Sequence, residues 1–382
     1  IDVCSTRAIA AAGDHVRVEP YLCMGCGACA SVCPTGAMTY AAPSMPDLGQ
    51  RVRAMLGAFA RAGGKAPALL ITEARGMQRL SDLGAAARTQ QARGLPASLV
   101  PLEVLHVASV GPDASLAALA AGASRIRFLV DEKTAPTYIN AIREHAELIN
   151  TIVAGLGWSE DVVDVIEAHD IVALDNALNA QPNAPALVPA AQFAWQAVKR
   201  ATLGMALEHL HRHSPHASQT ELVVDLPAGA PFGTVAVDAS ACTLCMSCVG
   251  QCPTNALAAG QDTPALKFFE ANCVQCGLCA SSCPEDAITL KPRIAFGASA
   301  RSARTVAQTR PYECIRCHKP FGTARMIEAM LAKLGSHAVF SGAIDRLRMC
   351  ADCRVIDVFS SGDEARVIGV GESTLPKQGE PS

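Results

Sequence analysis

The sequence predicts a multidomain chain of mixed α/β and α+β class, in which two cysteine-rich modules flank a small α/β domain with a parallel sheet. Most of the 17 cysteines lie toward the two ends of the chain, and residues 34–241 contain none. Within that stretch, short apolar runs alternate with patterns of helical period, which is typical of parallel strands joined by crossover helices.

Three stretches repeat one pattern, in which four cysteines are spaced by two, two and three residues and are followed by a proline. The runs are Cys23, Cys26, Cys29 and Cys33; Cys242, Cys245, Cys248 and Cys252; and Cys273, Cys276, Cys279 and Cys283. Thiolates at this spacing hold iron in [4Fe-4S] clusters. A disulfide framework, the alternative, requires an oxidising compartment and a small domain with little core. We therefore predict clusters in a reducing compartment, and we expect that compartment to be the cytoplasm.

Cys4 stands apart from these runs until the chain is aligned with itself. It precedes Cys23 much as Cys252 precedes Cys273, and the residues that follow the two, STRAIAAAG and PTNALAAG, are similar. We therefore predict that Cys4 is the last cysteine of a further run. In that case the residue before Ile1 in the natural protein is expected to be a cysteine.

The runs CMGCGACASVCP, CTLCMSCVGQCP and CVQCGLCASSCP resemble those of ferredoxin-type multi-cluster electron-transfer proteins, or polyferredoxins. The resemblance implies a two-cluster module for each pair of runs, with three cysteines of one run and the last of the other on each cluster. The implied sets are Cys242, Cys245, Cys248 with Cys283; Cys273, Cys276, Cys279 with Cys252; and Cys23, Cys26, Cys29 with Cys4. Cys33 is left for a fourth cluster, whose other ligands would precede Ile1.

The cysteine-free stretch predicts a helix over 47–62, strands at 68–71, 102–107 and 126–130, and helices from 112 and over 136–156. Residues 65–157, with PLEVLHVASVGPDASLAALAAGA, resemble the delta subunit of methyl-viologen-reducing hydrogenases. That resemblance implies docking to another redox protein. Farther on, the pattern predicts a long helix over 188–212 and a hairpin from 221–226 and 233–237.

The segment 291–319 carries seven Lys and Arg residues against one acid, Glu313. It is either a solvated linker or a docking arm for an acidic redox partner. Nucleic acid is the remaining alternative, although no aromatic residues are interleaved to stack on bases. Expected partners are redox proteins such as a formate dehydrogenase or a hydrogenase, which dock at this segment or on the α/β domain.

Two further pairs, Cys314 with Cys317 and Cys350 with Cys353, each have the CxxC spacing and are separated by 32 residues. Paired CxxC knuckles hold structural zinc, which we predict here in a zinc-ribbon-like domain. Four thiolates also suit another iron-sulfur cluster or a single iron, and free thiols are the remaining alternative.

These patterns predict seven regions. They are a first ferredoxin-like module at 1–42, the α/β domain at 43–158, a mainly helical segment at 159–220, a two-cluster module at 221–292, a basic linker at 293–311, the zinc-ribbon-like domain at 312–360 and a tail at 361–382.

A net charge of −3 gives no reason to expect nucleic acid, and no apolar run is long enough to span a membrane. No motif for a nucleotide cofactor and no catalytic residue stands out. The sequence thus predicts an iron-sulfur electron-transfer protein or oxidoreductase subunit rather than an enzyme by itself. Two alternatives stay open: the electron-transfer half of an oxidoreductase whose catalytic domain precedes Ile1, and an iron-sulfur redox regulator.

Overall fold

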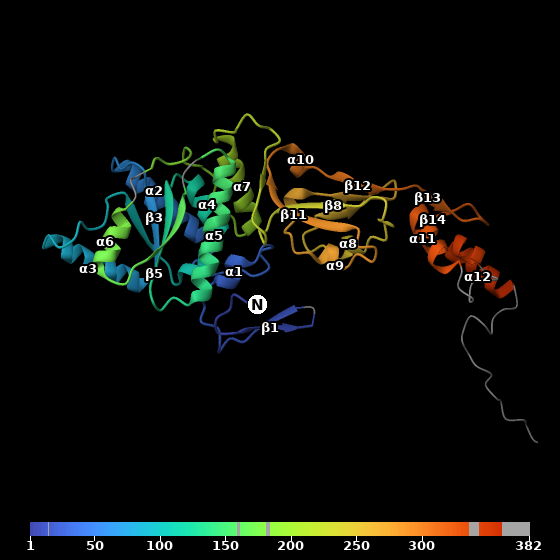
Figure 1. Ribbon diagram of the computed structural model, residues 1–382, viewed down its shortest axis with the longest axis horizontal. Coiled ribbons are helices and arrows are strands. Elements are labelled where there is room, and N and C mark those ends of the chain that lie inside the picture. The colour runs from blue at the N-terminus through green and yellow to red at the C-terminus, as the bar shows by residue number, and fades with distance from the viewer. Residues whose placement is uncertain (14, 159–160, 181–183, 336–343, 361–382) are drawn as a thin grey trace, which may run out of the picture. The chain divides into compact units, whose positions relative to one another are not determined.

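A computed structural model describes residues 1–13, 15–158, 161–180, 184–335 and 344–360. The predicted tail at 361–382 lies outside the described residues. The chain forms two compact units, and Figure 1 labels their elements. The first unit comprises residues 1–234, 270–276 and 291–302, and the second takes the remaining residues from 235 onward.

A four-stranded parallel sheet forms the centre of the first unit, with the order β4-β3-β5-β6. The strands are β3 (Ala68–Thr72), β4 (Leu99–Glu103), β5 (Arg125–Val130) and β6 (Val163–Glu167). In register, Leu70 lies opposite Pro101 on one side and Arg127 on the other. Every residue of β3 is buried, as expected for a strand covered on both faces. The predicted parallel sheet is therefore confirmed.

Helices cover both faces of this sheet (Figure 1). They are α2 (Met45–Arg61), α3 (Ala74–Arg88), α4 (Pro112–Ala120), α5 (Pro136–Gly155), α6 (Ile171–Asn179) and α7 (Lys199–Arg212). On one face Leu83 of α3 and Leu174 of α6 pack against Leu70, whereas α2, α4 and α5 pack with Ile71 on the other. Proline opens α4 and α5, where a missing amide hydrogen costs nothing.

Three elements of the first unit differ from the sequence expectation. The sheet continues beyond residue 158, because β6 pairs with β5 through Val163 opposite Ile126. The strand expected at 102–107 instead spans Leu99–Glu103 and is followed by the short helix η1 (Val107–Ser109). The long helix expected from residue 188 begins only at Lys199. Trp195 is buried against Gly49 of α2, and this tertiary contact holds the preceding chain outside a helix.

At the start of the chain, β1 (Ile9–Ala12) and β2 (His15–Val18) form an antiparallel hairpin, and α1 (Ala28–Val32) follows the first two cysteines of the run and contains the third, Cys29. In the second unit, β9 (Leu257–Ala259), β10 (Ala265–Phe268) and β12 (Arg304–Gln308) form an antiparallel sheet of order β12-β10-β9. The short helices α8 (Ser247–Gly250) and α9 (Leu278–Ser281) carry cysteines of the second and third runs.

A third sheet has the order β7-β11-β8, with β7 (Val223–Asp225), β8 (Gly233–Val237) and β11 (Ile288–Ala295). The hairpin expected from 221–226 and 233–237 is therefore wrong, because β11 lies between the two strands. Most of the expected basic linker also has regular structure, in the end of β11, α10 (Ala298–Arg301) and β12. Several of its charges form ion pairs, namely Lys291 with Asp225, Arg293 with Glu270 and Arg301 with Glu208.

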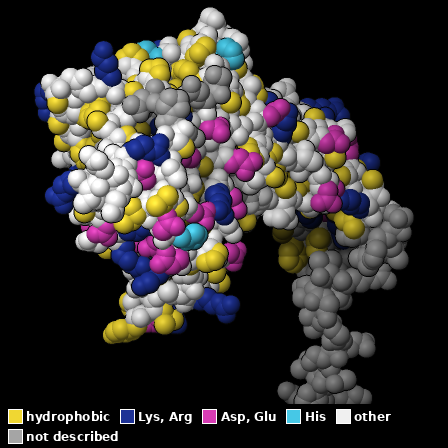
Figure 2. All heavy atoms as spheres, turned by 60° about the vertical axis from the view of Figure 1, so that its left-hand side comes forward, with side chains coloured by type: hydrophobic (Ala, Val, Ile, Leu, Met, Phe, Trp, Pro, Cys, Tyr) yellow, Lys and Arg dark blue, Asp and Glu magenta, His cyan; other side chains and the backbone are white. Residues whose placement is uncertain are grey.

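The C-terminal part of the second unit contains the hairpin of β13 (Pro311–Glu313) and β14 (Pro320–Thr323). The helices α11 (Ala324–Leu334), η4 (Ile344–Arg348) and α12 (Ala351–Ser360) follow. Among the described residues, no helix combines the length and apolar character that crossing a membrane requires. On the face drawn in Figure 2, acidic and basic side chains are interspersed.

Candidate functional site

The three CxxCxxC loops share one backbone conformation. In each loop, the residue before the second cysteine and the residue after it have a positive φ, between 53° and 79°. These residues are Gly25 and Gly27, Leu244 and Met246, and Gln275 and Gly277. Left-handed backbone costs a residue other than glycine about 1 kcal/mol. Its occurrence at Leu244, Met246 and Gln275 indicates that the surroundings impose the loop shape, as is common at functional sites.

The fourth cysteine of each run also has a recurring local geometry, and Cys4 shares it. Three residues after each of these cysteines the backbone is again left-handed, at Arg7, Gly36, Asn255 and Asp286. The next amide donates to the sulfur in three cases, with N to Sγ distances of 3.3 Å for Cys4, 3.2 Å for Cys252 and 3.3 Å for Cys283. Cys33 receives its amide hydrogen bond from Met38 at 3.5 Å. Cys4 therefore has the local structure of a fourth cysteine.

These hydrogen bonds favour the thiolate form that binds iron. Burial opposes ionisation of Cys33, but hydrogen bonds from Thr35, Met38 and Gly36 outweigh it and lower its pKa to about 7. The pKa values of Cys4 and Cys252 are lowered in the same way, with burial again outweighed by hydrogen bonds. A thiolate is the metal-binding form of cysteine, so these sulfurs are prepared as ligands.

Cys242, Cys245, Cys248 and Cys283 surround one cavity of the second unit. Its other walls are mainly apolar, with Leu244, Leu266 and Ile288 among them. Burial and the neighbouring Cys242 and Cys245 raise the pKa of Cys248 to about 11, because several negative sulfurs would face one dry space. A cationic iron centre removes that repulsion, and the donor set of four thiolates fits a [4Fe-4S] cluster.

The partner set implied by the ferredoxin resemblance is divided between the two units. Cys273 and Cys276 belong to the first unit, and Cys252 and Cys279 belong to the second, so this set remains a prediction. Within the first unit, Gln275 donates through Nε2 to the sulfur of Cys273 at 3.4 Å and to the carbonyl of Thr234 at 3.1 Å.

The first cysteine loop packs on the segments that follow the carboxyl ends of β4 and β5. A Cβ atom on Gly27 would lie 2.7 Å from Cβ of Ser109 in η1, so only glycine allows this approach. Tyr138, at the start of α5, accepts a hydrogen bond from Cys26 at 3.4 Å and lies 2.6 Å from Oγ of Ser5. This edge of a parallel sheet is where such folds usually bind ligands. No sequence motif marked Tyr138 as part of the site.

The first two residues of α7 lie beside the cysteine runs within the first unit. Lys199 donates to the carbonyls of Ala30 and Ser31 at 2.8 and 2.5 Å and lies 3.8 Å from Asp113. Burial lowers the pKa of Lys199. Lys199 and Arg200 line a cavity of about 450 Å³ that Cys33 and Cys276 also reach. Nothing in the sequence indicated that Lys199 and Arg200 lie beside the cysteine runs.

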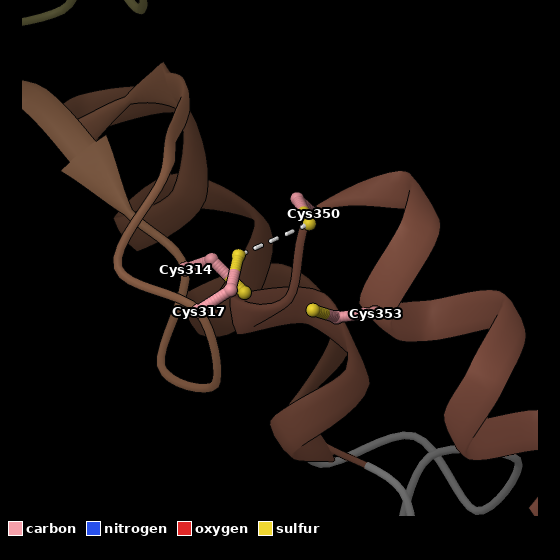
Figure 3. A group of neighbouring side chains, drawn as sticks. All are labelled: Cys314, Cys317, Cys350 and Cys353. Atoms are coloured by element: carbon pink, nitrogen blue, oxygen red, sulfur yellow. Dashed lines mark hydrogen bonds between the residues drawn. The ribbon is translucent and has the colours of Figure 1, made fainter.

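The four C-terminal cysteines converge, and Figure 3 shows their sulfurs directed toward one space. Cys314 and Cys317 lie in the turn between β13 and β14, whereas Cys350 precedes α12 and Cys353 lies in its first turn. The second pair therefore begins a helix instead of forming the expected knuckle. All four sulfurs lie within 4.8 Å of one another, and those of Cys317 and Cys350 are 3.7 Å apart.

The surroundings favour a metal at these four sulfurs. Cys314 is completely buried, which opposes ionisation, but the amides of Cys350, Cys317 and Arg316 lower its pKa to about 6. Burial and hydrogen bonds with the other three thiols raise the pKa of Cys353 to about 12. The sulfur of Cys314 is thus stabilised as a thiolate, whereas that of Cys353 stays protonated until a metal cation binds.

Comparison with protein-family models identifies a 4Fe-4S binding domain at residues 16–39 and a 4Fe-4S dicluster domain at residues 241–288. No curated protein matches the chain. The chain therefore carries two ferredoxin-type iron-sulfur regions, as the sequence predicted. Neither match reaches residues 65–157, so the hydrogenase delta resemblance stays a prediction.

Proposed function

We propose that the chain relays single electrons through [4Fe-4S] clusters between redox partner proteins, such as a formate dehydrogenase or a hydrogenase. The observation that carries this proposal is the repeated cysteine geometry. One backbone conformation recurs in three CxxCxxC loops, and a second recurs after four terminal cysteines. Such repetition favours several equivalent redox sites along one chain, which is what a relay needs.

The proposed ligands follow the crossed scheme described above, with three complete sets and Cys33 available to a fourth. When bound, a [4Fe-4S] cluster accepts and returns one electron at a time. The amides of Ala8, Ala256 and Ala287 stabilise negative charge on the ligating sulfurs. The apolar wall around Cys248 limits the access of water. Both effects set the reduction potential at which each site operates.

We further propose that Cys314, Cys317, Cys350 and Cys353 hold structural zinc. A tetrahedral zinc with bonds of about 2.3 Å places its sulfurs roughly 3.8 Å apart, close to the 3.7 Å between Cys317 and Cys350. In a [4Fe-4S] cluster each sulfur binds a different iron, so the four sulfurs stand farther apart. A single iron fits the same spacing, and metal analysis separates the two ions.

The proposed contacts with redox partners lie at the basic segment 291–319 or on the α/β domain. Lys291, Arg293 and Arg301 have carboxylate partners inside the first unit. Arg310 pairs with Glu328 and Arg304 lies over the ring of Phe268, whereas Arg316 and Lys319 are exposed beside the zinc site. These two charges are therefore the ones proposed to meet an acidic partner.

The electron-transfer proposal is tested by delivery of electrons to a separate protein. Anaerobically purified chain is reduced with dithionite, freed of reductant and mixed with excess oxidised cytochrome c. We expect about three electrons per chain, one from each completed cluster. A chain that contains clusters but returns no electrons would contradict the proposal.

The zinc proposal is tested with Cys353→Ser. This variant should lose about one zinc per chain and keep its iron. Loss of iron with no change in zinc would contradict the zinc assignment.

A further inference from the structure

The surroundings of Cys273 differ from those of the Cys242, Cys245, Cys248 and Cys283 set in charge and in hydrogen bonding. The difference begins with Arg200, a half-buried residue of α7. Its Nη2 donates to the carbonyl of Ala271 at 2.8 Å, and its guanidinium lies 5.4 Å from the ring centre of Phe232. Ala271 is two residues before Cys273, so a cation is fixed beside this cysteine loop.

The positive charge of Arg200 has no acidic partner in the part of the chain that the structure describes. No carboxylate there forms an ion pair with Arg200. Burial lowers the pKa of this arginine, and the negative charge of a Cys273 thiolate acts in the opposite direction. The hydrogen bond to Ala271 therefore holds this positive charge close to Cys273, two residues farther along the chain.

Gln275 adds a hydrogen bond to the same sulfur. Its side-chain amide reaches Sγ of Cys273 and is held in place by the carbonyl of Thr234. The backbone of Gln275 is left-handed, and a Cβ atom on Gly233 would lie 2.3 Å from its side chain. The amide is thus kept in this position by close packing.

Within the described part of the chain, the other cysteine set has no comparable cation or side-chain hydrogen bond beside its sulfurs. The cavity of Cys242, Cys245, Cys248 and Cys283 has mainly apolar walls, and no side-chain amide or cation there donates to these four sulfurs. Its one acid, Glu285, is neutralised by Lys333 at 3.0 Å. The amide hydrogen bonds to Cys252 and Cys283 are nearly equal in length, so they do not distinguish the two sets.

A positive charge and a hydrogen bond to a ligand sulfur both favour the reduced, more negative state of an iron-sulfur cluster. We propose that Arg200 and Gln275 raise the reduction potential of the cluster that Cys273 binds, and so make it the electron-accepting end of the two-cluster module. This inference rests on the proposed function, because it requires that both clusters are present. It assigns a direction to the relay, which the cysteine pattern alone leaves open.

The test is a redox titration of the full chain, followed by low-temperature EPR. Cys283→Ser removes the signal of the other set and so identifies the signal that belongs to the Cys273 cluster. Arg200→Gln and Gln275→Met should each move the midpoint of that signal to more negative potential. Arg200→Lys, which keeps the charge, should retain a midpoint close to that of the unaltered chain.

Iron content and thermal unfolding verify that each variant is assembled and folded. An unchanged midpoint in both Arg200→Gln and Gln275→Met, or an equal shift of both signals, would overturn the inference. Because Gln275→Met leaves Arg200 intact, failure of one variant to fold does not remove the test. Absence of iron from the unaltered chain would instead defeat the proposed function itself.

Discussion

The residue that connects the sequence to the site most directly is Cys4. The sequence placed it at the position of Cys252, and its sulfur has the same amide hydrogen bond and the same left-handed residue three positions later. These features depend on the chain immediately around the cysteine. A pattern of local spacing is therefore enough to predict them.

Replacement of Cys4 by serine should remove the cluster held by Cys23, Cys26 and Cys29, because the fourth thiolate is lost. Iron content should fall by about four atoms per chain, and one EPR signal should disappear. Cys33→Ser is the matched control, since Cys33 has similar local geometry but is assigned to a different cluster. If Cys33→Ser removes this signal and Cys4→Ser does not, the assignment of Cys4 is wrong.

Crossed ligation has its own test in Cys283→Ser. The affected signal should be that of the cluster held by Cys242, Cys245 and Cys248, because these four residues surround one cavity. Cys252→Ser should affect the other cluster of the module. EPR spectra of both variants distinguish the signals, and the reverse pattern would refute the crossed scheme.

At the scale of elements, the three cysteine loops need the same backbone but not the same residues. Met246 occupies in the second run the position that Gly27 occupies in the first, and both are left-handed. Only Gly27 also faces a close neighbour, since Ser109 leaves no room for a side chain. The two positions therefore have the same backbone conformation, but only position 246 has room for a side chain.

Gly27→Met should lower the stability of the first unit by about 2 kcal/mol, from left-handed strain and from the contact with Ser109. For a unit of this size the melting temperature should fall by about 5 °C. The reverse exchange, Met246→Gly, should change stability by less than about 1 kcal/mol. Thermal unfolding of both variants measures this difference. Equal melting temperatures for Gly27→Met and the unaltered chain would show that Ser109 imposes no constraint.

Two of the elements that the sequence mispredicted are decided by distant contacts. The alternating residues of β7 and β8 suggested a hairpin, but β11 inserts between the two strands. The pattern over 188–212 suggested one helix, but burial of Trp195 against Gly49 keeps its first part irregular. Neither effect is visible in local periodicity, because each depends on residues more than 50 positions away.

At the scale of the whole molecule, the sequence predicted the two iron-sulfur regions and the parallel sheet that lies between them in the chain. Cysteine spacing and strand periodicity are local properties of the chain, so both could be recognised from the sequence. It did not predict what surrounds the sulfurs. Tyr138, Lys199, Arg200 and Gln275 acquire their positions through packing, and lysine, arginine and glutamine in a sequence carry no sign of such a role. The residues proposed to tune the redox sites could thus be found only in the structure.

The proposed electron relay depends on the metals that the protein binds. Iron, acid-labile sulfide and zinc should be counted in anaerobically purified chain, with EPR of the dithionite-reduced sample. We predict about twelve irons with a matching amount of sulfide, four for each completed cluster, and about one zinc. A chain that contains neither iron nor labile sulfide, with its cysteines present as disulfides, would contradict the account.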